Sequence, residues 1–163
     1  MSKIIISDSS PLIALGSIDQ LSVLFQLFEQ VVIPKIVADE CLVDKTRPGA
    51  FAISQAIDGA FIQIHPPFPA NNNELFEVLD EGEAAAITLA NSLCASLLID
   101  EKLGRHVAKQ LGVKIIGTIG ILLLAKQKNL IPSVKPILTL LKNGHYFLSD
   151  QLIKEALMRA GEK

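Results

Sequence analysis

The sequence predicts an α/β protein in which a central parallel sheet of about four to five strands lies between two layers of helices, a three-layer α/β/α sandwich. Two observations lead to this prediction. Short apolar runs that suit strands alternate with longer segments whose apolar residues recur at helical spacing, which is the pattern of βαβ units. Half of the 163 residues are hydrophobic, which suits one globular domain that buries roughly 70% of the surface of its unfolded chain.

The first half of the chain supplies three predicted strands and the helices between them. Ser9 or Ser10 is expected to cap the helix after the first strand, with Pro11 near its first turn, where the missing N–H costs nothing. Pro34 is expected to open a helix directly after the second strand. Strands are expected at 3–7, 31–33 and, at a sheet edge, 60–64, and helices over 17–30, over 34–41 and up to about Ile57.

The second half is richer in helices. Residues 65–73 carry three prolines and three asparagines and are predicted to form a loop. Because neither side of this loop has enough core to fold alone, residues 1–163 are predicted to be a single domain, on which the C-terminal helices from about 133 pack. Strands are expected at 95–99 and 113–116, and helices over 81–93, 101–112, 119–128, 133–143 and 149–160.

Composition argues against several classes of protein. The N-terminal "MSKIIISD" has one Lys before a short apolar run and then an Asp, which predicts a first strand rather than a signal peptide. The longest apolar run, 115–125, is about half of the ~20 residues that a membrane span needs, so no membrane association is expected. Cys41 and Cys94 fall in apolar helical contexts without a C-x-x-C pattern, which predicts two reduced, buried thiols in a cytoplasmic protein and no structural zinc.

The net charge is −2, but acidic and basic residues are distributed unevenly along the chain. Residues 1–100 hold 13 Asp and Glu against 4 Lys and Arg, whereas residues 101–163 hold 4 against 11. Two interpretations fit: ordinary solvated helix faces, or an acidic site flanked by basic helices, as a nucleic-acid-cleaving protein requires.

Two aspartates follow predicted strands. Asp8 ends the first strand and Asp100 ends "ASLLID". Parallel α/β sheets bind ligands outside the carboxyl ends of their strands, so both carboxylates are expected at the same edge of the sheet. The alternative for each is structural, since Asp before a helix also caps free N–H groups.

Two glutamates lie on predicted apolar helix faces. Glu40 follows Ile36 by four residues and Val37 by three, and Glu83 precedes apolar residues at i+4 and i+7. The alternative for Glu83 is a first-turn Glu favoured by the helix dipole. An acid on an apolar face is costly unless it is paired, and residues 1–100 contain one arginine, Arg47, in a predicted loop.

The repulsion among four such carboxylates calls for a counter-charge. Two carboxylates about 6 Å apart repel by roughly 3 kcal/mol at an effective dielectric constant near 20. Up to six such pairs would cost as much as a whole domain's stability. Protons or a divalent ion would relieve this cost, and oxygen ligands without His or Cys favour Mg²⁺ or Mn²⁺ over zinc.

Five segments in order carry a resemblance to a known family: Asp8 with the "SSPLIAL" that follows it, "VVIPKIVADE", "LDEGEAAAITLA", "LLIDEKLGRHVAKQLG" and "VKIIGTIGILLLAKQKNLI". Together they resemble the PIN-domain superfamily of metal-dependent ribonucleases, in the branch related to VapC-type toxins. The resemblance implies that Asp8, Glu40, Glu83 and Asp100 form an acidic, metal-binding and catalytic quartet, which are the four acids selected above.

The same resemblance implies supporting roles around the quartet. Ser10 matches a small polar position that supports the first Asp by hydrogen bonding, and Glu101 is a candidate to replace or assist Asp100. Thr118 follows the "VKII" strand and is a candidate for support at the same sheet edge, with an N-cap role as the alternative. The stretch after Asp100 departs from the family pattern, because it lacks the acid-plus-aromatic ending.

The implied chemistry is hydrolysis of RNA phosphodiesters by water that one or two Mg²⁺ or Mn²⁺ ions activate. Lys102, Arg105 and Lys109 recur at helical spacing, with His106 beside them, and form a candidate RNA-binding stripe; a solvated helix face is the alternative, and His106 is a poor candidate for a catalytic base. The family resemblance also names a small antitoxin protein and a homodimer as candidate partners, besides the RNA substrate.

Two other functions compete with the nuclease. A catalytically inactive PIN-like module would bind RNA or a protein partner. Its apolar C-terminal helices could dock a partner or a second copy of the chain, and burial of their apolar faces within the domain is the alternative. A phosphatase or phosphotransfer domain would also place an Asp after a strand, but it generally needs a second Asp two residues later, where this chain has Ser10. "GTIGIL" (117–122) lacks the spacing of a phosphate loop, so its glycines are expected to allow close strand–helix packing.

Overall fold

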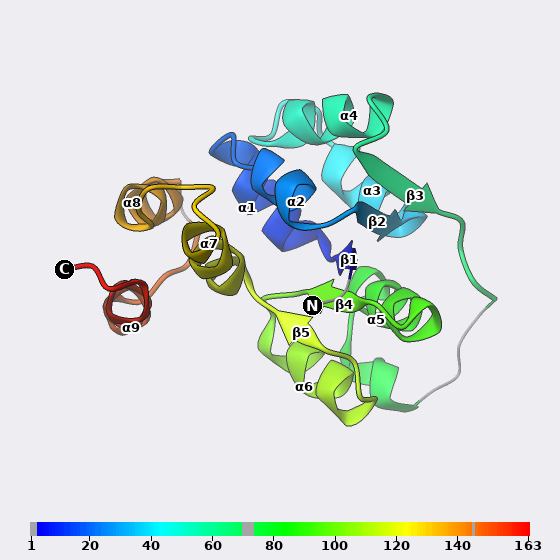
Figure 1. Ribbon diagram of the computed structural model, residues 1–163. Helices are drawn as coiled ribbons and strands as arrows, with labels where there is room; N and C mark the ends of the chain where they lie inside the picture. The colour runs from blue at the N-terminus through cyan, green and yellow to red at the C-terminus, as the bar shows by residue number, and fades with distance from the viewer. Residues whose placement is uncertain (1–2, 70–73, 145) are drawn as a thin grey trace.

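The computed structural model describes residues 3–69, 74–144 and 146–163, and strands alternate with helices along most of this length (Figure 1). The four residues 70–73 of the predicted 65–73 loop lie outside the described residues. The strands are β1 (Ile4–Ser7), β2 (Gln30–Pro34), β3 (Ile62–His65), β4 (Ser96–Leu98) and β5 (Ile115–Ile116). The helices are α1 (Ser9–Ser17), α2 (Ser22–Leu27), α3 (Lys35–Leu42), α4 (Ala50–Asp58), the short 3₁₀ helix η1 (Glu74–Val78), α5 (Glu81–Leu93), α6 (Lys102–Gln110), α7 (Thr118–Gln127), α8 (Lys135–Asn143) and α9 (Asp150–Ala160).

The five strands form one parallel sheet in the order β3-β2-β1-β4-β5. The chain moves outward from β1 through β2 to β3, then returns to the other side of β1 for β4 and β5. The strand order therefore reverses between β1 and β4, which is where open α/β sheets bind ligands at the carboxyl ends of their strands. The prediction of β3 as an edge strand is confirmed.

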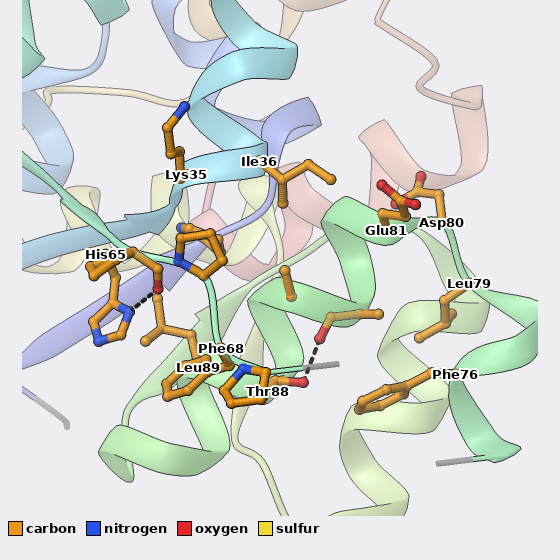
Figure 2. A pocket seen from close by; sticks show the side chains of 16 residues that line it. Lys35, Ile36, His65, Phe68, Phe76, Leu79, Asp80, Glu81, Thr88 and Leu89 are labelled. Atoms are coloured by element: carbon orange, nitrogen blue, oxygen red, sulfur yellow. Dashed lines mark hydrogen bonds between the residues drawn. The ribbon is translucent and has the colours of Figure 1, made fainter. Parts of the chain in front are cut away.

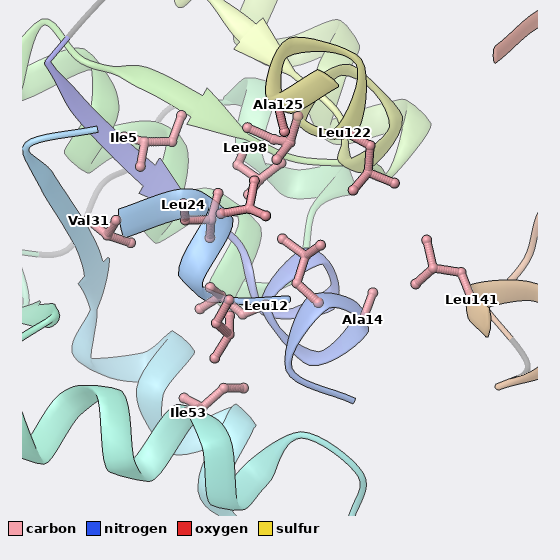
Figure 3. Packing of buried hydrophobic residues seen from close by; sticks show 14 of the residues in the cluster. Ile5, Leu12, Ala14, Leu24, Val31, Ile53, Leu98, Leu122, Ala125 and Leu141 are labelled. Atoms are coloured by element: carbon pink, nitrogen blue, oxygen red, sulfur yellow. The ribbon is translucent and has the colours of Figure 1, made fainter. Parts of the chain in front are cut away.

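Helices cover both faces of the sheet, which confirms the predicted three-layer sandwich. Adjacent strand residues point to opposite faces, so Ile5 packs with α1, α2 and α4, whereas Ile6 packs with α5 and α6. Figure 3 shows the first core, with Leu24 near the sheet residue Leu98 and with Leu12 on the way from these to Ile53 of α4. Because both faces are covered in the middle of the sheet, β1, β2 and β4 consist mostly of buried apolar residues, as in other parallel sheets, whereas the edge strand β3 carries the polar residues Gln63 and His65.

The C-terminal helices extend the first core. α9 packs against α7, and Leu138 and Leu141 of α8 and Ala156 of α9 are buried in the same cluster as the sheet residues. Lys126 on α7 donates hydrogen bonds to the backbone oxygen of Ala160 and to the Glu162 carboxylate, which ties the end of the chain to α7. No helix within the described ranges is long and apolar enough to cross a bilayer.

Two local predictions are wrong. The helix expected over 17–30 is shorter: α1 ends at Ser17, and only Ser22–Leu27 is helical in the later part. Asp19 has φ of 57°, a left-handed conformation that interrupts an α-helix and that a short polar side chain tolerates. The expected cap at Ser9 or Ser10 is replaced by Asp8, which occupies the N-cap position of α1.

The two cysteines differ in exposure. Cys41 is buried, as predicted, whereas Cys94 is exposed, so the prediction of two buried thiols is wrong for Cys94. Cys94 ends α5 in a left-handed conformation with φ of 52°, at the turn that leads the chain from the helix toward β4. The apolar surroundings in the sequence belong to Leu93 and Ala95, and the turn directs Cys94 away from the core.

Candidate metal centre

Asp8 lies at the carboxyl end of the central strand. Its backbone N–H donates to the carbonyl oxygen of Leu98 at 3.0 Å, which places it beside the end of β4 at the point where strand order reverses. Although Asp8 occupies the N-cap position of α1, its side chain makes no capping hydrogen bond beyond a contact with the Ser9 backbone N–H, which opposes the rise in its pKa. Burial raises the pKa of Asp8 to about 6, and the negative charges of Asp80, Glu40 and Asp100 add to this rise.

Asp100 follows β4 and is held by three donors. The backbone N–H of Thr118 donates to Asp100 Oδ1 at 2.8 Å, and the Thr118 hydroxyl donates to Oδ2 at 2.6 Å. The Tyr146 hydroxyl also donates to Oδ2. Burial and the Asp100 charge raise the pKa of Tyr146, so its hydroxyl stays protonated and remains a donor.

Glu40 projects from α3 toward the first turn of α5. Its Oε2 accepts a hydrogen bond from the Ser9 hydroxyl at 3.1 Å. A Cβ atom added to Gly82 would overlap the Glu40 carboxylate and lie 2.9 Å from its Cδ, so only glycine leaves this carboxylate room. Burial raises the pKa of Glu40, and the charges of Asp80 and Glu81 raise it further.

Glu83 lies in the first turn of α5 and faces the start of α6. A Cβ atom on Gly104 would come within 3.2 Å of Glu83 Oε2, which places the carboxylate against that helix. Burial raises the pKa of Glu83 to about 8, and a hydrogen bond with Asp80 and the charges of Asp80, Glu101 and Asp8 contribute. The negative charge of this carboxylate is therefore disfavoured at neutral pH unless a cation compensates it.

Sequence reasoning missed a fifth acid, Asp80. It is the N-cap of α5 and accepts a hydrogen bond from the Glu83 backbone N–H at 2.8 Å. Its negative charge raises the pKa values of Asp8, Glu40 and Glu83, so it lies close to all three. The sequence did contain a signal, because Asp80 and Glu83 have the spacing of a capping box.

Four helices begin around these acids. Asp8 precedes α1, Glu83 is in the first turn of α5, Asp100 is two residues before α6, and Thr118, which binds Asp100, is the first residue of α7. Helix N-termini carry a partial positive charge and free N–H groups, which offset part of the carboxylate repulsion. The raised pKa values of Asp8 and Glu83 show that this compensation is incomplete.

The donor set fits a hard divalent cation in its chemistry. The group consists of carboxylate oxygens, the ligands of Mg²⁺ and Mn²⁺, without His or Cys among them. Within the described ranges, no three His, Cys, Asp or Glu side chains are close enough as they stand to hold one ion together. The acids are therefore gathered at one sheet edge, but their side chains are not already arranged as a ligand shell.

Of the three predicted supporting residues, Thr118 lies where it was expected, beside Asp100, whereas Ser10 and Glu101 take other places. Ser10 is exposed, and its neighbour Ser9 makes the hydrogen bond to the acidic group. Glu101 is the N-cap of α6, and its Oε2 accepts from the Gly104 N–H at 2.8 Å. Thr118 contacts Asp100 directly, and no sequence pattern had indicated that Tyr146 would join it.

The predicted basic stripe on α6 is divided. Lys102, His106 and Lys109 are exposed, whereas Arg105 is half-buried and donates to the carbonyl oxygen of Ile99 at 2.8 Å. A Cβ atom on Gly117 would lie 3.0 Å from Arg105 Nη1 and 2.9 Å from Asp100 Oδ1. Arg105 therefore stands beside the acidic group, and Gly117 provides the space for both side chains.

A cavity of about 510 Å³ lies on the α5 side of the acids (Figure 2). Its lining is mostly apolar and includes Phe68, Phe76 and Leu79. Asp80 and Glu81 lie together at the end of the cavity away from His65. The acids therefore border a mostly apolar cavity on the side of α5.

The chain was compared with known proteins. It is similar to a PilT N-terminus domain protein from the hyperthermophilic archaeon Sulfolobus solfataricus P2, at 23% identity and a TM-score of 0.44, covering 73% of this chain and 90% of that one. It is also similar to a domain of a functionally unknown protein from Methanocaldococcus jannaschii DSM 2661, at 15% identity and a TM-score of 0.44, covering 71% and 91%. No protein with a curated function matches. The PIN-domain family DUF3368 matches residues 4–162, and the chain belongs to this family.

Proposed function

We propose that the protein is a Mg²⁺- or Mn²⁺-dependent ribonuclease. PIN domains are generally nucleases and generally use divalent metal ions. The observation that carries the proposal for this chain is the uncompensated negative charge at the point where strand order reverses. Asp8 and Glu83 have pKa values raised to about 6 and about 8, and Glu40 is raised as well, which is the electrostatic condition that a bound cation relieves.

The acids and the residues around them would take different roles in the proposed reaction. Asp8, Glu40, Glu83 and Asp100 would hold the ion, and Asp80 adds negative charge beside them. A bound divalent ion supplies activated water and stabilises the charge that develops on the phosphate. Thr118 holds Asp100 in one orientation, and Ser9 does the same for Glu40. Arg105 stands beside Asp100, where its remaining N–H groups can bind the substrate phosphate.

Metal binding and RNA cleavage test the proposal together. We expect purified protein to deplete free Mn²⁺ in a titration followed by EPR, and to cleave labelled single-stranded RNA with Mn²⁺ or Mg²⁺ but not with EDTA. Asp8→Asn and Glu83→Gln should lose both properties, whereas Glu77→Gln, a change at an exposed carboxylate on η1, should keep them. Cleavage that persists in Asp8→Asn would contradict the proposal that these acids carry the activity.

A catalytically inactive RNA- or protein-binding module is the second candidate. It is favoured by the absence, among the described residues, of three side chains already arranged around an ion, and by the three donors that occupy Asp100. Wild-type protein that binds RNA with equal affinity in Mn²⁺ and EDTA, and never cleaves it, would support this candidate over the nuclease.

The proposed cellular role is that of a toxin in a toxin–antitoxin pair, with a small antitoxin protein and a second copy of the chain as partners. Induced expression should then arrest growth, and Asp8→Asn should relieve the arrest. Unimpeded growth with well-expressed wild-type protein would remove the toxin role. Light scattering on purified protein would test the dimer directly.

A further inference from the structure

A second cavity of about 580 Å³ opens on the other side of Asp100. It lies between the end of β5, the first turn of α7, the segment 146–148 and α9. In Figure 1, α9 follows α8 on the side of α7 away from the sheet. The side chains that matter for its chemistry are Asp100, Arg105, Tyr146, Phe147, Leu152 and Arg159.

The lining combines positive charge with exposed apolar surface. Arg105 and Arg159 both face this cavity, and Arg105 uses one N–H of its guanidinium on the Ile99 carbonyl oxygen, which leaves further donors. Phe147 is 89% exposed and Leu152 is 40% exposed. An aromatic side chain left almost entirely in water beside two arginines provides a stacking surface next to cationic groups.

The cavity on the α5 side has the opposite electrostatic character. Phe68 and Phe76 also offer aromatic surface there, but Asp80 and Glu81 line it, and Lys35 in its lining is already paired with Asp39 at 3.1 Å. These carboxylates repel a phosphate backbone, whereas Arg105 and Arg159 attract it. Charge complementarity therefore selects the cavity beside Asp100 as the path of a polyanion that reaches the acidic group.

We propose that the cavity beside Asp100 binds unpaired nucleotides of a single-stranded RNA, with Arg105 and Arg159 on backbone phosphates and Phe147 stacked on a base. This inference rests on the proposed ribonuclease function and names the cavity and the three side chains by which this chain would hold the strand. The volume of the cavity beside Asp100, about 580 Å³, is in the range of small-molecule ligand sites. Double-stranded RNA is recognised by shape across about 16 base pairs, and its stacked bases leave no face for Phe147.

The test is the affinity for a short fluorescent single-stranded RNA, measured by anisotropy in EDTA so that cleavage does not intervene. Phe147→Leu keeps an apolar side chain but removes the ring, and we expect its affinity to fall about fivefold or more, the usual loss for one base stack. Arg159→Gln should weaken binding and lower the slope of log affinity against log salt by about 0.7, which corresponds to one phosphate on a single strand. Arg159→Lys should restore that slope.

Matched controls separate this cavity from other aromatic surfaces. Phe51→Leu, at a 71% exposed side chain on α4, should bind RNA as the wild type does. Phe68→Leu examines the rival cavity beside Asp80. If Phe68→Leu weakens binding and Phe147→Leu does not, the inference is overturned. A hairpin duplex of the same length that binds as tightly as the single strand also overturns it.

Cleavage distinguishes the failure of this inference from the failure of the proposed function. If the wild type cleaves RNA in Mn²⁺ and Phe147→Leu and Arg159→Gln change neither KM nor affinity, the nuclease stands and the cavity does not. If these variants bind RNA weakly and the wild type never cleaves, the cavity stands and the nuclease does not. In an active enzyme, both variants should raise KM with little change in kcat, because they contact the strand away from the scissile phosphate.

Discussion

Replacing Asp8 by Asn should stabilise the protein at neutral pH when no metal ion is present. Asp8 is 5% exposed, and its pKa is raised from 3.8 to about 6. At pH 7 the unfolded chain ionises this carboxyl group at no cost, whereas the folded chain must ionise it in a buried site beside Asp80, Glu40 and Asp100. The substitution removes that penalty and keeps a side chain of nearly the same shape.

The magnitude follows from the pKa difference. A rise of roughly two pKa units corresponds to about 3 kcal/mol of lost stability once the group is fully ionised. At about 2–4 °C per kcal/mol for a chain of this size, Asp8→Asn should raise the Tm by roughly 6–12 °C at pH 7. This is an upper value, because any hydrogen bond that Asn makes less well than Asp reduces the gain.

The direction of the pKa shift at Asp8 determines how the stability of the wild type changes with pH. Between pH 4 and pH 6 the folded state binds more protons at Asp8 than the unfolded state, so wild-type stability increases as the pH falls through this range. The pKa of about 8 at Glu83 extends the same trend up toward pH 8. The advantage of Asp8→Asn should therefore be full at pH 7 and should vanish near pH 4.

Urea unfolding in EDTA at pH 4, 5, 6 and 7 measures this for the wild type, Asp8→Asn and Glu77→Gln. The last variant removes an exposed carboxylate and should stay within about 0.5 kcal/mol of the wild type. An Asp8→Asn variant that is no more stable than the wild type at pH 7, or whose advantage is the same at pH 4, would refute the electrostatic explanation.

Three further substitutions test the geometry around the acids. Tyr146→Phe removes one donor from Asp100 while keeping the ring, and it should weaken Mn²⁺ affinity about 10-fold in a titration followed by EPR; unchanged affinity would show that this hydroxyl does not orient the ligand. Asp100→Asn should lower the free energy of unfolding by about 2 kcal/mol, because the neutral amide loses the charge that strengthens the hydrogen bonds from Thr118 and Tyr146; a more stable variant in urea unfolding would contradict this. Gly82→Ala adds a Cβ where the Glu40 carboxylate lies and should displace that flexible side chain. We expect the variant to lose Mn²⁺ binding with little change in Tm. Normal Mn²⁺ binding would show that Glu40 is not a ligand.

The sequence alone determined the order of most strands and helices and the existence of an acidic sheet edge. Hydrophobic spacing is a local property, and the carboxyl ends of parallel strands must meet on one side of a sheet, so Asp8 and Asp100 were found without a structure. The break at Asp19 escaped prediction because helical spacing continues through it, and only the backbone shows its left-handed conformation.

Only the tertiary structure decided which groups surround those acids. Tyr146 and Asp100 are 46 residues apart, and their hydrogen bond depends on how the segment after α8 returns past α7, which no local pattern encodes. Ser9 rather than Ser10 contacts Glu40, because the side-chain directions along the first turn of α1 are set by the packing of that helix on α3. The sequence alone therefore pointed to four of the acids near the sheet edge but not to Asp80. Long-range packing decided which groups hold and surround these acids, because those contacts join segments that lie far apart in the chain.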